Sequence, residues 1–120
     1  MARGLQMTMT TLRVLMVLLE NPAAKRYGLD ISKATGLGVG TVYPILMRFE
    51  QAGWLTSAWE EIDPQVAGRP RRRFYRLTAE GVRSARVALV EAQQALEPTR
   101  QGGNGLLNPR EVPGWNYSSA

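Results

Sequence analysis

The chain has 120 residues, a length that suits one domain, or one domain followed by a tail. Cysteine and histidine are both absent, which excludes disulfide bonds, the usual zinc sites and the commonest catalytic triads. The net charge is +5, and thirteen of the fifteen basic residues are arginine, whose planar fork matches phosphate oxygens and guanine edges. The composition therefore favours a nucleic-acid-binding protein over an enzyme, and we expect no metal and no cofactor.

The N-terminal segment does not predict export or membrane insertion. Its unbroken apolar run, residues 14–19, is too short for the hydrophobic region of a signal peptide, and Arg13 interrupts the apolar sequence. The run is also far shorter than a membrane span. We therefore expect a cytoplasmic protein that binds no membrane, and we expect residues 1–6 to be dispensable.

Hydrophobic spacing predicts three helices in the first half of the chain, at residues 8–20, 29–35 and about 38–52. Asn21 and Pro22 end the first, while Gly36 and Gly53 close the second and third. The core face of the third helix is predicted to consist of Val42, Ile45, Leu46 and Phe49. Two helices joined by a turn with glycine have the spacing of a helix-turn-helix unit.

A hairpin is predicted next, with strands at residues 54–62 and 72–78 around a loop rich in Pro, Gly and Asp. Symmetric pairing of these strands would place Trp59 beside Phe74. It would also place Glu61 beside Arg72, which is a favourable contact between opposite charges.

Thr78 is predicted to cap a fourth helix that extends to about Glu97. Its apolar residues repeat with heptad-like spacing at Val82, Ala85, Leu89, Ala92 and Leu96. Such a seam predicts a dimer interface. The alternative is that the helix folds back onto its own domain, with Val87 and Val90 on the inward face.

The order helix, helix, helix, hairpin, helix predicts a winged helix, mainly α in the α+β sense. It would comprise a three-helix helix-turn-helix core, a two-stranded wing hairpin and a C-terminal dimerisation helix. The predicted divisions are a DNA-binding domain at 8–78, a dimerisation helix at 79–97 and a flexible tail at 98–120. The tail is rich in Gly, Pro, Asn and Ser, yet Trp115 and Tyr117 near its end could dock onto something.

Two stretches, YGLDISKATGLGVGTVYPILMRFEQAGWL (27–55) and GRPRRRFYRLTAEG (68–81), resemble the PadR family of bacterial transcriptional regulators. The similarity covers roughly residues 8–97 and centres on GTVYPIL (40–46) and the arginine-rich wing strand. It implies a homodimer that binds palindromic operator DNA, usually as a repressor. Such proteins often release the DNA when a small molecule binds. Only one helix and a tail follow the wing, as in the short subfamily. Some short members bind flat aromatic drugs through an aromatic residue on that helix, and no aromatic residue lies between Gly81 and Glu97 here.

The start of the third helix supplies the first group of candidate DNA-binding residues. Thr41 and Tyr43 would enter the major groove, and Gly40 would let the backbone approach a phosphate. Pro44 implies that the regular helix begins near Tyr43, after an irregular turn whose free N–H groups attract phosphate. Alternatively, Thr41 only caps the helix and Tyr43 packs on a neighbour. For Arg48, a phosphate contact and simple exposure to solvent are equally favoured.

The wing supplies the second group of candidates: Arg69, Arg71, Arg72 and Arg73. Charge placement favours phosphate or minor-groove contacts for Arg71 and Arg72, while Arg76 is expected to be structural. The alternative is that surface ion pairs absorb these arginines, since acids lie on the same hairpin at Glu60, Glu61 and Asp63.

We therefore expect a transcriptional regulator that binds double-stranded DNA at a near-palindromic operator as a homodimer. Repression and release by a small-molecule effector are expected from the resemblance. One alternative is an architectural winged-helix factor that bends DNA during recombination of a mobile element. Another is a winged helix that docks onto a protein, in which case the basic surface would be incidental.

Overall fold

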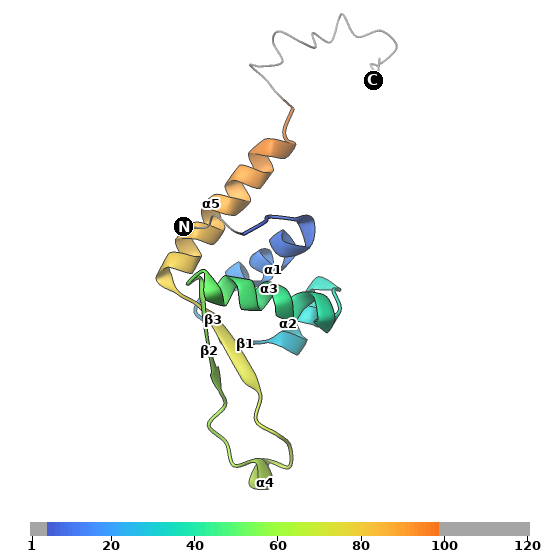
Figure 1. The fold of residues 1–120 in the computed structure, drawn as a ribbon, viewed down its shortest axis with the longest axis vertical. Helices are drawn as coiled ribbons and strands as arrows, with labels where there is room; N and C mark the ends of the chain where they lie inside the picture. The colour runs from blue at the N-terminus through green and yellow to red at the C-terminus, as the bar shows by residue number, and fades with distance from the viewer. Residues whose placement is uncertain (1–4, 99–120) are drawn as a thin grey trace, which may run out of the picture.

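A computed structural model describes residues 5–98. Its elements are α1 (Met9–Glu20), β1 (Arg26–Tyr27), α2 (Gly28–Thr35), α3 (Val39–Gln51), β2 (Leu55–Trp59), α4 (Pro64–Ala67), β3 (Arg73–Leu77) and α5 (Ala79–Leu96). Helices α1, α2 and α3 form the body of the molecule, the β2–β3 hairpin extends from it as a wing, and α5 leaves in the opposite direction (Figure 1). This arrangement confirms the predicted winged helix of mainly helical α+β class.

The helix boundaries follow the local signals in the sequence. The Thr8 hydroxyl accepts a hydrogen bond from the Thr11 N–H at 3.2 Å and begins α1. Thr78 caps α5 in the same way, through the Gly81 N–H at 2.9 Å. Helix α2 ends at Gly36, whose φ of 78° lies in the left-handed region that glycine favours.

Helix α3 begins within the range predicted for it, about 38–52, and not near Tyr43 as Pro44 implied. It starts at Val39, and the Val42 N–H already donates to the Gly38 carbonyl at 3.0 Å. The predicted irregular turn before Tyr43 is therefore wrong. Pro44 is tolerated inside the helix, where its missing N–H removes only the bond to the Gly40 carbonyl.

The sheet has three antiparallel strands in the order β1-β3-β2, because the short β1 adds to the predicted hairpin. Trp59 pairs with Arg73, and Ala58 pairs with Phe74, so the symmetric register was wrong by one residue. The wing tip also contains α4, which no pattern had predicted. The Asp63 carboxylate caps this helix at one end, and Gly68 closes it at the other.

The core gathers residues from every major element. Its buried members are Val14, Leu15, Val17, Leu18, Ile31, Val42, Ile45, Leu46, Phe49, Trp54, Leu55, Tyr75, Leu77 and Ala85. The predicted core face of α3 is thus confirmed. Trp54 stacks on Phe49 with ring centroids 5.4 Å apart. Leu5, from the segment expected to be dispensable, is partly buried and also packs against this core.

The residues of α5 that face the core are not those that either prediction gave. One prediction placed Ala85 at a dimer interface, and the other placed Val87 and Val90 on the inward face. Ala85 is fully buried in the core of its own chain, with Val82 and Ala88 packed beside it, so Ala85 has no surface to offer a dimer. Val87 and Val90, proposed as the inward face, are instead exposed. The close approach of Gly81 to the Trp54 backbone sets how α5 is rotated about its own axis. Ala85 and Ala88 follow Gly81 at helical spacing and therefore face the core as well.

Among residues 5–98, no helix is both long and apolar enough to span a bilayer. The predicted flexible tail, with Trp115 and Tyr117, lies outside the described residues except for Pro98.

We predict that Gly81→Ala destabilises the fold by about 3 kcal/mol, because the new Cβ overpacks rigid backbone. It would lie 2.8 Å from the carbonyl carbon of Trp54 and closer still to its oxygen. Urea denaturation measures the effect. Gly40→Ala is the matched control, since nothing lies within 4 Å of its Cβ position and alanine should gain up to about 1 kcal/mol in a helix. Equal unfolding midpoints for Gly81→Ala and the wild type would contradict the prediction.

Candidate nucleic-acid interface

The solvent face of α3 carries the predicted recognition residues. The exposed residues of this helix are Val39, Gly40, Thr41, Tyr43, Pro44, Met47, Arg48 and Gln51. They lie opposite the buried face, so α3 presents one complete side to a partner. Arg48 forms no ion pair among residues 5–98, so its charge is free on this side.

Tyr43 combines the two roles that the sequence left as alternatives. Its ring packs on the α2 backbone so closely that a Cβ on Gly28 would lie 2.5 Å from the ring and the hydroxyl. The side chain nevertheless remains 42% exposed. The packing fixes where the ring lies, and the exposed part is presented beside Gly40 and Thr41.

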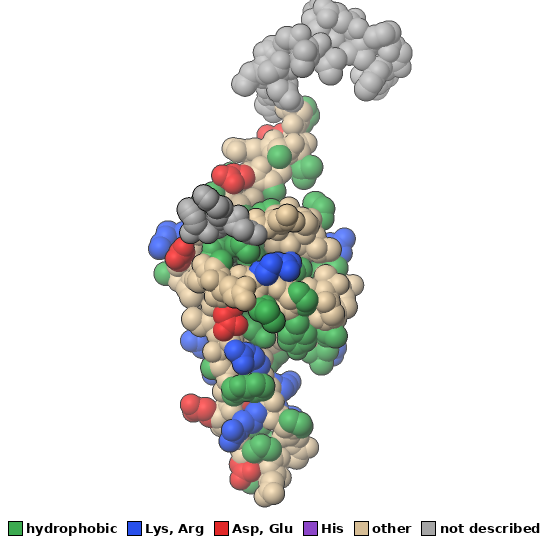
Figure 2. Space-filling model, viewed as in Figure 1, with side chains coloured by type: hydrophobic (Ala, Val, Ile, Leu, Met, Phe, Trp, Pro, Cys, Tyr) green, Lys and Arg blue, Asp and Glu red, His purple; other side chains and the backbone are tan. Residues whose placement is uncertain are grey.

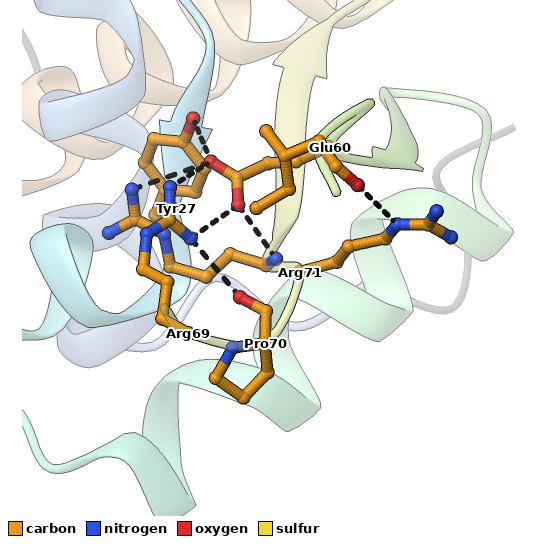
Figure 3. Close-up of polar contacts among 7 residues, drawn as sticks. Tyr27, Glu60, Arg69, Pro70 and Arg71 are labelled. Carbon is orange, nitrogen blue, oxygen red and sulfur yellow. Dashed lines mark hydrogen bonds and ion pairs between the residues drawn. The ribbon is translucent and has the colours of Figure 1, made fainter. Parts of the chain in front are cut away.

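The Glu60 carboxylate organises the base of the wing (Figure 3). It accepts hydrogen bonds from the Arg69 guanidinium at 2.7 and 3.2 Å, from the Tyr27 hydroxyl at 3.1 Å and from the Arg72 backbone N–H at 2.9 Å. The Arg72 guanidinium lies 3.4 Å from it and 4.3 Å from the centre of the Tyr27 ring. One carboxylate thus ties β1 to both arms of the wing.

These contacts change the electrostatics of the wing. The Arg69 guanidinium, and then the hydrogen bonds from Arg72 and Tyr27, hold the pKa of Glu60 far below its usual value, although partial desolvation opposes the shift. Glu60 in turn raises the pKa of Arg69. The alternative of intra-wing ion pairs therefore holds for Arg69 and Arg72, and of the three acids considered the partner is Glu60. Neither Glu61 nor Asp63 forms an ion pair in the described part of the chain.

Arg71 and Arg73 are disposed differently. The Arg71 Nε donates to the Ile62 carbonyl at 3.0 Å, and no carboxylate in residues 5–98 pairs with it. The Arg73 Nε donates to the Ser57 hydroxyl at 3.0 Å, and its Nη2 lies 3.6 Å from Glu50 of α3. The wing and α3 are thus joined through Arg73.

Strand alternation separates the basic residues of β3. Arg73 and Tyr75 project from one face of the sheet together with the core residue Leu77, whereas Arg72 and Arg76 project from the other. Only the first face adjoins α3. On the side shown in Figure 2, basic side chains follow the wing below the helical body, with hydrophobic side chains between them.

Sequence reasoning missed Glu50 and Ser57 because neither belongs to a basic or aromatic motif. The Ser57 hydroxyl donates to the Glu50 carboxylate at 2.6 Å and accepts from Arg73. The correct strand register would have placed Ser57 on the face of Arg73. The contact with Glu50 depends on how α3 packs against the sheet, and no local pattern reports that.

Apolar side chains are exposed along α5 and α1, away from the wing. They are Met9, Met16, Val87, Val90 and Leu96. Two adjoining hollows of about 460 and 360 Å³ lie beside α5 and share Met7, Ala88 and Glu91 in their linings. Of the predicted seam, Leu89 and Ala92 are half-buried and Leu96 is 76% exposed. This surface is separate from the face formed by α3 and the wing.

Solved structures of winged-helix regulators have the same fold. AbfR bound to DNA matches with a TM-score of 0.60 at 21% identity, covering 87% of this chain and 68% of that one. In its disulfide form AbfR matches at 22% identity, and the chain spans 65% of it. BpsR of Bordetella bronchiseptica, described as regulated in DNA binding by 6-hydroxynicotinic acid, matches with a TM-score of 0.58 at 24% identity, covering 88% and 70%. The homodimeric winged helix-turn-helix domain of Mb0332 from Mycobacterium bovis matches with a TM-score of 0.54 at 22% identity, covering 75% and 73%.

Residues 14–87 match the model of the transcriptional regulator PadR-like family. The chain therefore belongs to that family, and its resemblance to PadR regulators is confirmed. No curated protein sequence matches it. The family and the structural neighbours are transcriptional regulators and not enzymes.

We predict that Glu60→Gln lowers the urea midpoint at pH 7, and that its difference from the wild type shrinks as the pH falls. The depressed pKa of Glu60 means that its stabilisation is complete above about pH 5. The stabilisation is lost below the usual value of 4.5, because the unfolded chain then takes up a proton that the folded chain refuses. Glu61→Gln is the control and should have a small effect, because Glu61 forms no ion pair in the described part of the chain. A Glu60→Gln deficit that stays constant from pH 7 to pH 3 would contradict the prediction.

Proposed function

We propose that the protein is a homodimeric regulator that binds double-stranded DNA at a near-palindromic operator and represses transcription. The observation that carries this proposal is the direct connection between α3 and the wing. Through Arg73 and Glu50, the exposed side of α3 and one face of the basic wing form a continuous surface. A duplex is the polyanion that such a surface fits.

In this proposal the start of α3 contacts the bases of the operator and so determines its sequence preference. Gly40, Thr41, Tyr43 and Pro44 are exposed in its first two turns, where a recognition helix meets base edges in the major groove. Tyr43 is held against α2, so its exposed part meets the groove at little entropic cost. Arg48, one turn further along, contacts a phosphate.

The wing supplies most of the electrostatic affinity. Arg71 and Arg73 have no tight carboxylate partner, so they contact phosphates or the minor groove. Arg69 and Arg72 add positive charge nearby but give hydrogen bonds to Glu60, so we assign them mainly to holding the wing in place.

Dimerisation through α5 provides the two copies that a palindrome requires. Leu89, Ala92 and Leu96 remain available on α5, and exposed methionines of α1 extend the apolar surface. The homodimeric Mb0332 domain supports this part of the proposal, and the DNA-bound AbfR supports duplex binding. Release by a small-molecule effector is proposed on the precedent of BpsR, and a cytoplasmic location is proposed on that of the family.

We predict that Tyr43→Phe binds duplex DNA with reduced sequence discrimination while its thermal stability stays close to that of the wild type. The substitution keeps the ring and its packing on Gly28. It removes only the hydroxyl, and with it a hydrogen bond that contributes about 1 kcal/mol. Selection from random duplexes at fixed salt gives the operator, and competition against scrambled duplexes gives the discrimination. Gln51→Ala, at the far end of α3, is the control. Unchanged discrimination would exclude the Tyr43 hydroxyl from base readout, and a wild type that selects no duplex would refute the proposed function.

We predict that Leu89→Asp yields monomers in analytical ultracentrifugation, because a charge in an apolar interface is costly to desolvate. Leu89 is half-buried and is not among the residues packed on the core of its own chain, so the monomer should keep its fold. Gln94→Asp, exposed on the same helix, is the control and should remain dimeric. Sedimentation of Leu89→Asp as an intact dimer would exclude this part of α5 from the interface.

A further inference from the structure

Three side chains form a connected group between α3 and the wing, which we name the α3–wing relay: Glu50, Ser57 and Arg73. The Ser57 hydroxyl donates to Glu50 at 2.6 Å and accepts from the Arg73 Nε at 3.0 Å. The Arg73 Nη2 lies 3.6 Å from the same carboxylate. The guanidinium also lies over the Trp59 ring, 5.5 Å from its centre.

The relay constrains only part of the guanidinium. The Nε and Nη2 are directed at Ser57 and Glu50, while the side chain stays 41% exposed. A free arginine side chain carries roughly 2 kcal/mol of rotamer entropy, which it must lose when it binds a phosphate. Arg73 has lost part of that freedom before any partner arrives, as preorganised binding groups do.

Arg76 provides a comparison within the same strand. It is exposed on the opposite face of the sheet, and no hydrogen bond or ion pair holds its side chain among residues 5–98. The network at Arg73 is therefore a feature of the face that adjoins α3 and not of wing arginines in general.

The strengths of the contacts indicate what the relay does. At 3.6 Å, and with both side chains partly exposed, the Arg73–Glu50 ion pair contributes little stability. The shorter bonds run through Ser57, so the hydroxyl sets the direction of the guanidinium. We propose that Ser57 and Glu50 are positioning residues that hold Arg73 ready for a phosphate of the operator, a role that rests on the proposed function.

The central test is Ser57→Ala, measured by operator binding at fixed salt. We expect about tenfold weaker binding, which equals 1.4 kcal/mol, with little change in thermal stability. Ser57→Thr keeps the hydroxyl and should restore binding. Thr56→Ala, the next residue of β2 on the opposite face, is the matched control and should bind as the wild type does.

A double-mutant cycle shows whether Ser57 acts through Arg73. In an Arg73→Ala background, Ser57→Ala should cause no further loss, because there is no guanidinium left to position. Wild-type binding by Ser57→Ala, or losses that simply add, would overturn the inference.

Glu50→Gln tests the same role by the sign of its effect. Removing a carboxylate near a polyanion should strengthen binding by charge alone. A positioning role predicts weaker binding in spite of that, and stronger binding would overturn it. If the wild type binds duplex DNA while Arg73→Ala binds equally well, this inference and the DNA contact assigned to Arg73 fail, whereas duplex binding by the protein stands. If the wild type binds no duplex, the proposed function fails with it.

Discussion

The backbone carbonyl of Trp54 is the point on which the arrangement of the molecule depends. It accepts hydrogen bonds from the Thr78 N–H at 2.9 Å and, more weakly, from the Thr78 hydroxyl at 3.3 Å. Gly81 crosses directly over it, where no other residue would fit. The Trp54 ring meanwhile stacks on Phe49 at the end of α3. One residue thus fixes the end of α3, the root of the wing and the start of α5 relative to one another.

This junction has a functional consequence, because a dimer reads two half-sites only if the distance between its recognition helices is fixed. In the proposed dimer that distance is set by α5, and the angle of α5 to α3 is set at Trp54. The hollow beside Trp54 is lined by Arg83 and Val87 of α5 and by Leu5 and Met7 of the N-terminal segment. Anything that changed the packing there would change the geometry of both half-sites together.

The sequence predicted the features that local chemistry controls. Thr8, Thr78 and Gly36 marked helix ends, and the periodicity of Val42 to Phe49 marked a buried face. It failed where the outcome depended on the packing of distant segments. The strand register differs by one residue from symmetric pairing, and α4 in the wing tip was not predicted. Ala85 was predicted at the dimer interface, whereas the close approach of Gly81 to Trp54 turns it into the core of its own chain. The candidate site shows the same division: the motifs located the basic residues, but only the fold distinguished Arg73, held beside α3, from Arg72, paired with Glu60.

That distinction changes how the positive charge of the wing is understood. A count of arginines suggests a flexible electrostatic patch, yet Glu60 engages two of them and β1, so the wing is braced against the body. Pairing with Glu60 neutralises part of the positive charge of the wing, and this would lower the non-specific affinity for DNA. In return, the remaining cations of the wing are held at fixed positions relative to α3. Fixed phosphate contacts would favour one register of the protein on the duplex over a uniform attraction to phosphate. In the proposed complex with DNA, an acidic residue within the basic hairpin would therefore aid recognition by ordering the surface, although it lowers the net charge.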